Sequence, residues 1–415
     1  MTVADLATAK TRRRGDLSPR FYNGNLDPRN RYCGKHGELS VPDRDPRNTS
    51  YVEYVFAVIP LETKRCCWTL CEYPIGSQAA LSTKGKNMSN WKSPLNDDAI
   101  DWLLEESNPH VRYFALRWLL GRPETNQDVA KTRQAIAQSA PIRKILQRQR
   151  PEGYWGSDAR PHHGTRGPLM LLMWLGAPKN DAIEKALDYR IKGCLLANGA
   201  YGIEITASAV WRPCHSGRRV LLPCHGAELL RLMIRYGYAD DPRGRKLLGW
   251  LVRTQQSDGV WSCISRVKPF PCMWATADIL RAFRELPSNW ITAEVRAARD
   301  RAVELFLNSN LCRYGQHKPG PDWFQFGFPL QWTSDILDVL ESVAPFVTPI
   351  DKRIREGLDI VLKKQDKKGR WACEKHPKGG KWIEQYIALE KIGEPSKWVT
   401  LHAQRMLKTV YAKEK

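Results

Sequence analysis

Three acidic residues occupy matching places in three apolar segments of the sequence. Glu228, Asp278 and Asp335 lie in GAELLRLM, TADILRAF and TSDILDVL. If these segments are equivalent helices of a repeat, the three carboxyl groups project from neighbouring helices at one height. Clustered carboxylates raise one another's pKa, so one of them can stay protonated as a general acid. The competing interpretation is structural, because acids near helix N-termini also stabilise the helix dipole.

The triplet Pro-Cys-His occurs twice in the segment PCHSGRRVLLPCHG, residues 213–226. Its second copy holds Cys224 and His225 at the start of an apolar helix, and Cys272 opens the next apolar helix. Thiol or acid–base chemistry at a cavity mouth is one interpretation of these residues. A structural role is another, since cysteines fill small gaps and histidines cap helices.

Zinc is a further interpretation of the cysteines and histidines. Adjacent residues rarely reach one tetrahedral ion, and the spacing matches no known zinc module. We therefore expect no metal cofactor and keep zinc as an alternative. The residues that could bind it are Cys214, His215, Cys224 and His225, or an N-terminal set of Cys33, His36, Cys66, Cys67 and Cys71.

A turn of one form recurs between helical segments. It reads Gln, two or three residues, Gly, any residue, Trp, and occurs at 149–155, 256–261 and 365–371. The helices before these turns carry one apolar stripe, and the helices after them are apolar all round. The first kind covers an outside and the second kind is enclosed. With 97–106 and 109–120 as the first pair, the sequence holds six helices of each kind. This number predicts an all-α (α/α)6 toroid of inner and outer helices.

The predicted toroid domain spans residues 96–415. Residues 1–95 lack the helical pattern and are rich in Pro, Gly, Asn and Asp, which are turn residues. The sequence therefore predicts an irregular N-terminal segment, whose packing on the toroid is left open.

The turns before enclosed helices resemble the repeats of squalene–hopene cyclases, and the toroid resembles the fold of the terpenoid cyclase and protein prenyltransferase superfamily. The chain also looks like bacterial cyclase-like proteins with prenyltransferase-type repeats. This resemblance covers about residues 97–411. It implies an isoprenoid substrate in a central apolar cavity, with aromatic faces that stabilise carbocations. The tryptophans on the expected inner helices are Trp174, Trp274, Trp332 and Trp398.

The chain departs from this family in its acids. The Asp-x-Asp-Asp motif of protonation-type cyclases has no counterpart here, and neither have the metal-binding motifs of ionisation-type terpene synthases. Protonation of an unactivated alkene is therefore in doubt.

The residues and the resemblance together predict a terpene cyclase-like enzyme that uses acid–base chemistry. The reaction would be cyclisation, isomerisation or dehydration through a protonated intermediate. A carbohydrate-active toroid hydrolase or lyase, and a non-catalytic module that binds a lipid or a partner, are the alternatives. The candidate catalytic residues are Asp335, Asp278, Glu228, His225, Cys224 and Cys272.

The net charge of +21, from 65 basic and 44 acidic residues, favours anionic partners such as a membrane surface or a diphosphate-bearing substrate. A solvated basic surface is the plainer interpretation. Nucleic acid is not expected, because no recognition motif is present. No apolar run approaches the length of about 18 residues that a bilayer requires, and no apolar segment follows the N-terminal arginines. With 11 cysteines, these features predict a cytoplasmic protein, with membrane contact at most peripheral.

Overall fold

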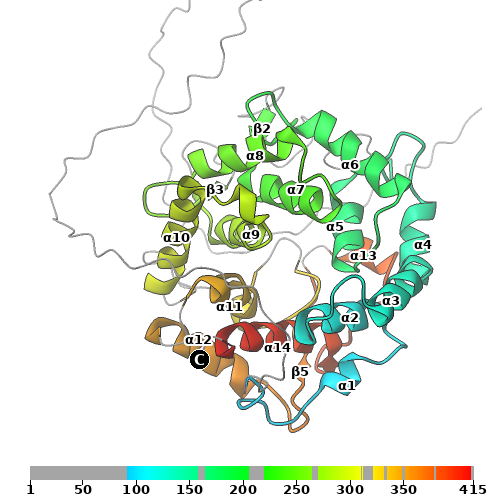
Figure 1. Cartoon of the computed structure of the whole chain (residues 1–415), viewed down its shortest axis with the longest axis vertical. Helices are drawn as coiled ribbons and strands as arrows, with labels where there is room; N and C mark the ends of the chain where they lie inside the picture. Colours follow the sequence, from blue (N-terminus) through cyan, green and yellow to red (C-terminus); the bar gives the residue numbers. More distant parts are fainter. Residues whose placement is uncertain are drawn as a thin grey trace, which may run out of the picture. The chain divides into compact units, whose positions relative to one another are not determined.

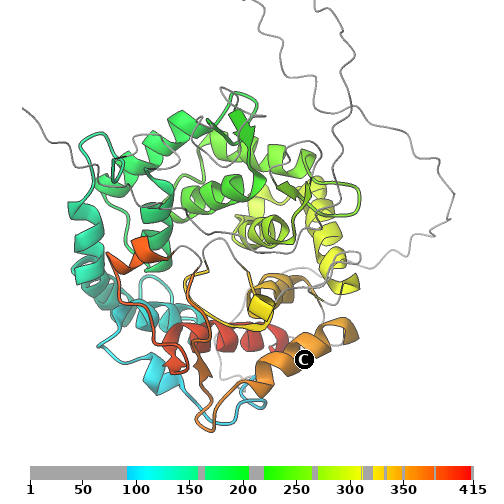
Figure 2. The same ribbon diagram turned by 180° about the vertical axis from the view of Figure 1, so that it is seen from behind.

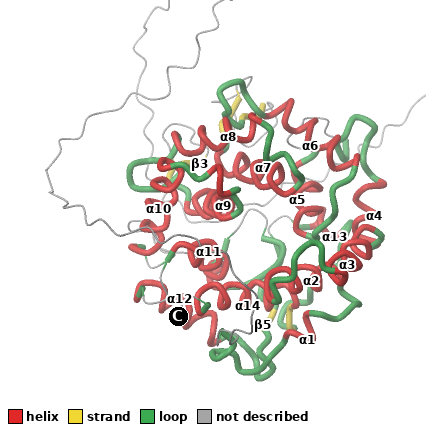
Figure 3. The backbone as a smooth tube through the Cα atoms, viewed as in Figure 1, coloured by secondary structure: helices red, strands yellow, loops and turns green. Residues whose placement is uncertain are grey.

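The computed structural model describes residues 91–157, 164–204, 219–263, 270–309, 311, 321–330, 334–347, 351–377 and 380–412. They belong to one compact unit, Thr83–Lys415. The unit is built mainly of helices, with small two-stranded sheets between them (Figure 3). Within the described residues, no helix is both long enough and apolar enough to cross a bilayer.

One set of helices surrounds a common centre, as both ring views show (Figures 1 and 2). Their neighbour contacts run in the order α2, α14, α11, α9, α7 and α5. These inner helices are α2 (Pro109–Phe114) with its π-helical continuation η1 (Ala115–Leu119), α5 (Arg166–Trp174), α7 (Pro223–Arg235), α9 (Met273–Arg284), α11 (Ile336–Val343) and α14 (Lys397–Tyr411).

A second set of helices lies outside the first (Figure 1). These helices bury one stripe each; α12, for example, buries Gly357, Leu358 and Val361. The outer helices are α1 (Ile100–Leu103), α3 (Gln127–Ala137), α4 (Ala140–Gln147), α6 (Asp181–Cys194), α8 (Pro242–Arg253), α10 (Ala293–Asn308) and α12 (Arg355–Lys363).

Short antiparallel strand pairs lie immediately before three inner helices. Strand β1 (Gly202–Glu204) pairs with β2 (Arg219–Leu221) before α7, and β3 (Ser262–Cys263) pairs with β4 (Phe270–Pro271) before α9. Strand β5 (Trp371–Ala372) pairs with β6 (Pro395–Ser396) before α14. The remaining short elements are α13 (Lys381–Glu384) and the 3-10 turns η2 (Ser288–Trp290), η3 (Pro321–Phe324), η4 (Ala344–Phe346) and η5 (Lys352–Ile354).

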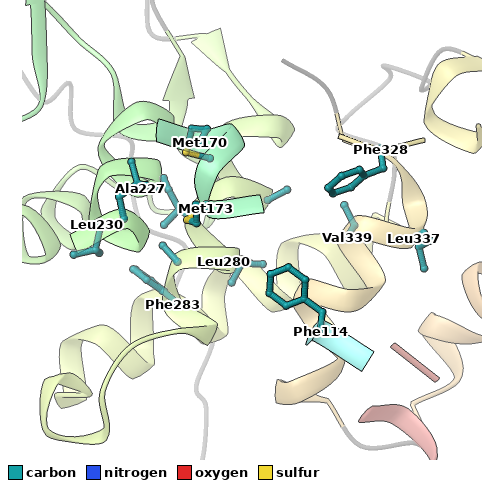
Figure 4. Packing of buried hydrophobic residues seen from close by; sticks show 14 of the residues in the cluster. Phe114, Met170, Met173, Ala227, Leu230, Leu280, Phe283, Phe328, Leu337 and Val339 are labelled. Carbon is teal, nitrogen blue, oxygen red and sulfur yellow. The ribbon is translucent and has the colours of Figure 1, made fainter. Parts of the chain in front are cut away.

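The core lies between the two sets of helices and between neighbouring inner helices. In Figure 4, Met170 and Met173 of α5 lie close to Ala227 and Leu230 of α7. All four side chains are buried. Since water is excluded from both sides of an inner helix, such a helix must be apolar nearly all round.

In the three Gln-Gly-Trp turns, the tryptophan is hydrogen-bonded to the outer helix that precedes the turn. In all three turns the indole N–H donates to a backbone carbonyl in the last part of the preceding outer helix, at 2.7 Å. The tryptophans are buried and their N–H groups therefore need such a partner. The pairs are Trp155 with Ile145, Trp261 with Leu251, and Trp371 with Val361.

The same turns also tie one outer helix to the next. The Gln255 side-chain amide donates to the carbonyl of Gly259 at 2.9 Å and to that of Ala298 in α10 at 2.8 Å. Gly259 has φ +94°, and a Cβ atom there would lie 2.4 Å from the carbonyl oxygen of Arg301. Only glycine permits this approach. The glutamine that acts in this turn is Gln255, one residue earlier than the Gln256 with which the sequence motif starts.

The same kinds of contact join the last Gln-Gly-Trp turn to the first described residues and so close the ring. The Gln365 side chain donates to the carbonyl of Pro94 at 3.0 Å, and a Cβ atom at Gly369 would lie 2.0 Å from the carbonyl oxygen of Asp97. On the inner side, His110 of α2 contacts the carbonyl of Leu175, the C-cap of α5, at 2.7 Å.

The predicted all-α class is confirmed, and the inner and outer helices form an α/α toroid. The sixfold count stays a prediction, because the ring is irregular where it closes. The outer helix α1 has only 4 residues, and two helices, α3 and α4, follow α2 on the outside.

We expect Gly259→Ala to lower the free energy of unfolding by about 3 kcal/mol, because it combines a strained φ with a clash against backbone. Gly121→Ala is the matched control, since Gly121 has φ +66° and no atom within 4 Å of the added Cβ. It should cost about 1 kcal/mol. Urea unfolding of both variants measures the difference in the free energy of unfolding. Equal losses would contradict the role of this turn in joining α8 to α10.

Candidate active site

The inner helices surround a cavity of about 70 Å³ that is partly open to solvent. It is lined from α2, η1, α5, α7, α9, α11 and α14, and by residues 327–330 of the segment before α11. Aromatic side chains form one part of its wall and charged side chains form another.

The aromatic part of the wall holds two of the four tryptophans proposed from the sequence. Trp398 stacks on Phe328 with ring centroids 4.0 Å apart, and Trp174 meets Phe328 edge-on at 6.5 Å. Phe114 and Trp118 stack at 4.4 Å and complete this wall. Ring faces of this kind attract a cation.

Asp335 also lines the cavity, and its carboxyl group is held in place by the backbone. It is the N-cap of α11: its Oδ1 accepts the N–H of Asp338 at 2.9 Å, because the first N–H groups of a helix lack partners within it. Only 1% of Asp335 is exposed. Burial raises the pKa of this carboxyl to about 7, against the opposing effect of Lys375, whose Nζ is 3.8 Å from Oδ2. A proton is therefore available on Asp335 at neutral pH.

The other two predicted acids do not line the cavity. Arg281 donates to Asp278 and, through Nη1 at 2.9 Å, to Asp338, so it links α9 to α11. Burial raises the pKa of Asp278 to about 6. Glu228 accepts two bonds from Arg166, one of them 2.7 Å from Nε, and binds α7 to α5. The three acids thus belong to the inner helices, but only Asp335 faces the cavity.

The cysteine and histidine candidates do not line the cavity either. His225 is buried edge-on against the Tyr201 ring at 6.3 Å. Cys272 is the N-cap of α9, and its Sγ accepts the N–H of Ala275 at 3.4 Å. Cys224 is partly buried in the first turn of α7.

Of the remaining candidates, Trp274 opens α9 with 43% of its surface exposed and lies away from the cavity. Trp332, Cys214 and His215 lie outside the described residues, as does the N-terminal set of cysteines and His36. In the part of the chain that the structure describes, no three His, Cys, Asp or Glu side chains are grouped as metal ligands.

The structure adds a charged cluster on the inner helices. Glu341 of α11 contacts His402 Nδ1 at 2.8 Å, Arg405 Nη1 at 2.9 Å and Arg284 Nη1 at 3.5 Å. Although burial alone would raise it, these neighbours hold the pKa of Glu341 below its usual range. Glu341 is therefore an ionised carboxylate in the cavity wall.

A second part of this cluster joins α7 to α9. Glu285 accepts from Arg231 at 2.8 Å and from Arg235 at 2.6 Å. One signal in the sequence marks these residues: in otherwise apolar segments, charges recur on one helical face, as in Glu228, Arg231 and Arg235. An ionic stripe on an enclosed helix indicates charges that face each other across helices.

Several solved structures are similar to this chain. The type II terpene cyclase MstE from Scytonema is 16% identical over 73% of this chain and 88% of its own, with a TM-score of 0.38. The ent-copalyl diphosphate synthase from Streptomyces platensis is 17% identical over 72% of this chain and 50% of its own, with a TM-score of 0.33. No family model and no curated protein matches the chain.

A third similar structure is the polysaccharide lyase BACCELL_00875, at 15% identity over 53% of this chain and 68% of its own, with a TM-score of 0.31. The structural neighbours thus include the terpenoid cyclases that the sequence resembles. The likeness is one of fold alone, so the roles of the residues follow from the cavity itself.

We expect Glu341→Gln to lower the free energy of unfolding by about 3 kcal/mol, because it leaves the partly buried Arg284 and Arg405 without their shared counter-charge. The matched control is Glu304→Gln, which removes an exposed partner of Arg353 and should cost less than about 1 kcal/mol. Thermal unfolding of both variants measures this, and a loss no larger than that of the control would show that the charges are solvated.

Proposed function

We propose that this chain is an enzyme of the terpene cyclase kind, which donates a proton from Asp335 to an isoprenoid bound in the central cavity. The observation that carries the proposal is the burial of a protonatable carboxyl group in a cavity walled by Trp174, Phe328 and Trp398. An apolar chain fits such a wall, and a positive charge formed beside it is stabilised by the ring faces.

The pKa of about 7 for Asp335 suits a general acid, which works best when its pKa is near the working pH. It is too high for protonation of an unactivated alkene. We therefore assign Asp335 an allylic hydroxyl or an activated double bond as its target. With an alcohol, the proton moves from Asp335 to the hydroxyl oxygen and the C–O bond breaks. Water departs with the electron pair of that bond, and an allylic cation remains.

His402 is the proposed proton acceptor, since it lines the cavity on α14. Its Nδ1 lies 2.8 Å from Glu341, which is ionised, so the hydrogen sits on Nδ1 and Nε2 is left to accept. In the proposal, Nε2 removes a proton from the carbon next to the cation, directly or after ring closure. From an alcohol, the products are water and either an open-chain or a cyclised polyene. His225 and Asp278 take no part, because neither faces the cavity.

The test of this proposal is a turnover assay with a panel of prenyl alcohols and prenyl diphosphates of increasing length, with product analysis by gas chromatography. We expect the wild type to convert at least one of them. Asp335→Asn should lower kcat at least about 100-fold, because it removes the proton but keeps an N-cap side chain. Asp241→Asn, at the N-cap of the outer helix α8, is the matched control and should be as active as the wild type. Full activity of Asp335→Asn would exclude Asp335 as the acid.

Stability should depend on pH in a way that reports the same proton. The carboxyl of Asp335 has a pKa of about 7 in the fold and an ordinary value near 3.8 when unfolded, so the folded state binds more protons between these values. Its contribution to stability is present below about pH 4 and is lost as the pH rises to about 7. The stability of Asp335→Asn relative to the wild type should therefore rise from pH 4 to pH 7, by at most about 1.4 kcal/mol per pH unit. Urea unfolding across this range measures it, and a constant difference would contradict the raised pKa.

A further inference from the structure

A second pocket, of about 250 Å³ and partly open to solvent, lies beside the central cavity. It is formed by α2 and η1, by α3, and by the C-terminal ends of α5 and α7. Phe114, Trp118 and Arg235 line both spaces, so the two are adjacent at these side chains.

The second pocket has an excess of positive charge. Arg117, Arg133 and Arg235 line it, against one carboxylate, Glu124. Glu124 is shared by Arg133 at 3.0 Å and Arg117 at 3.1 Å, while Arg235 is paired outside the pocket with Glu285. At least one positive charge therefore remains after these pairs are counted.

The arginines also keep donors that these bonds do not use. A guanidinium carries five N–H groups on three nitrogens. Among the described residues, Arg133 bonds through Nη1 alone, and Arg235 bonds through Nε and Nη2. Nitrogens of both side chains are thus left for an acceptor that enters the pocket.

Tyr236 supplies an independent observation. It is 3% exposed and lines the pocket, and its hydroxyl oxygen, which is shielded from solvent in this structure, makes no hydrogen bond within the described part of the chain. A buried hydroxyl without a partner costs about 1–3 kcal/mol, so such groups are rare. Burial raises the pKa of Tyr236 above its usual range, although Arg235 and Arg133 act against this from nearby. The hydroxyl is therefore a neutral donor close to two guanidinium groups.

We propose that this pocket binds an oxyanion, a phosphate or a carboxylate, through Arg133, Arg235 and the Tyr236 hydroxyl. Guanidinium groups match the geometry of both anions and form strong charge-assisted bonds with them. The C-terminal ends of α5 and α7 disfavour an anion, but this effect is small beside the net positive charge and the unused donors of the arginines. The binding site does not depend on the proposed chemistry of Asp335.

Two sources could supply the oxyanion. It is either the head group of the substrate, whose apolar part passes Phe114 and Trp118 into the central cavity, or a separate small anion. The two differ in how much an apolar tail adds to affinity, because only a head group brings a chain into the aromatic wall.

The experiment is isothermal titration calorimetry of the full chain at low salt with inorganic diphosphate and, separately, with geranyl diphosphate. We expect saturable binding of diphosphate by the wild type. Tyr236→Phe and Arg133→Gln should each raise its Kd about tenfold, the loss of one charge-assisted hydrogen bond. Tyr236→Phe removes a hydroxyl without a partner in the described structure, so it should leave the Tm unchanged or higher.

Tyr154→Phe and Arg143→Gln are the matched controls, since neither residue lines the pocket. Binding by the controls should equal that of the wild type. No saturable binding of diphosphate by the wild type, or equal weakening in all four variants, would overturn the proposal.

Geranyl diphosphate that binds at least about tenfold more tightly than diphosphate, with both weakened by Tyr236→Phe, identifies the anion as a head group. Equal affinities identify a separate anion, and both results support the site. Asp335→Asn should bind diphosphate as the wild type does, so a failure of the proposed acid and a failure of this site are separately visible.

Discussion

The structure depends on the hydrogen bond from a buried indole N–H to the end of an outer helix. In the turns of Trp155, Trp261 and Trp371, this bond fixes where the chain leaves one outer helix. The glycine of the same turn lies directly against the next outer helix, or against Asp97 where the ring closes. Neighbouring units are therefore held at one separation. A ring of units at constant separation keeps its inner helices apart, and the central cavity follows from that.

Charges on the enclosed helices are largely removed from water, and an unpaired charge there is costly. Two carboxyl groups of α11 show how pairing decides protonation. Glu341 lies beside two guanidinium groups, those of Arg405 and Arg284, and beside His402 Nδ1, and is ionised. Asp335 has Lys375 at 3.8 Å, and Arg281 also favours its ionised form, but the cost of burying its charge prevails. Two like groups on one helix thus have opposite states, which is the usual basis for an acid beside a stable anion.

Much of the fold could be predicted from the sequence, because helical periodicity and the Gln-Gly-Trp turns are local patterns. The position of Asp335 at the start of an inner helix could be predicted from the same local patterns. That Asp278 and Glu228 do not line the cavity could not be predicted, since it depends on which arginine each acid meets across helices. The arginines that bind these acids, Arg281 and Arg166, were not predicted as partners, because charged residues are normally exposed. Trp274 shows the converse: its place at the start of α9 is that of a cavity residue, but its side chain is exposed.

The central cavity and the second pocket meet at side chains with two roles each. Trp118 stacks on Phe114 and also carries Arg405, whose guanidinium carbon is 3.8 Å from its ring centroid. Arg235 lines both spaces while bound to Glu285. An anion in the second pocket would draw Arg235 and weaken its bond to Glu285, which Arg231 would then hold alone. Because Arg231 lines the central cavity, the charge in one space alters the field in the other. The paired charges of the inner helices thus couple the two spaces.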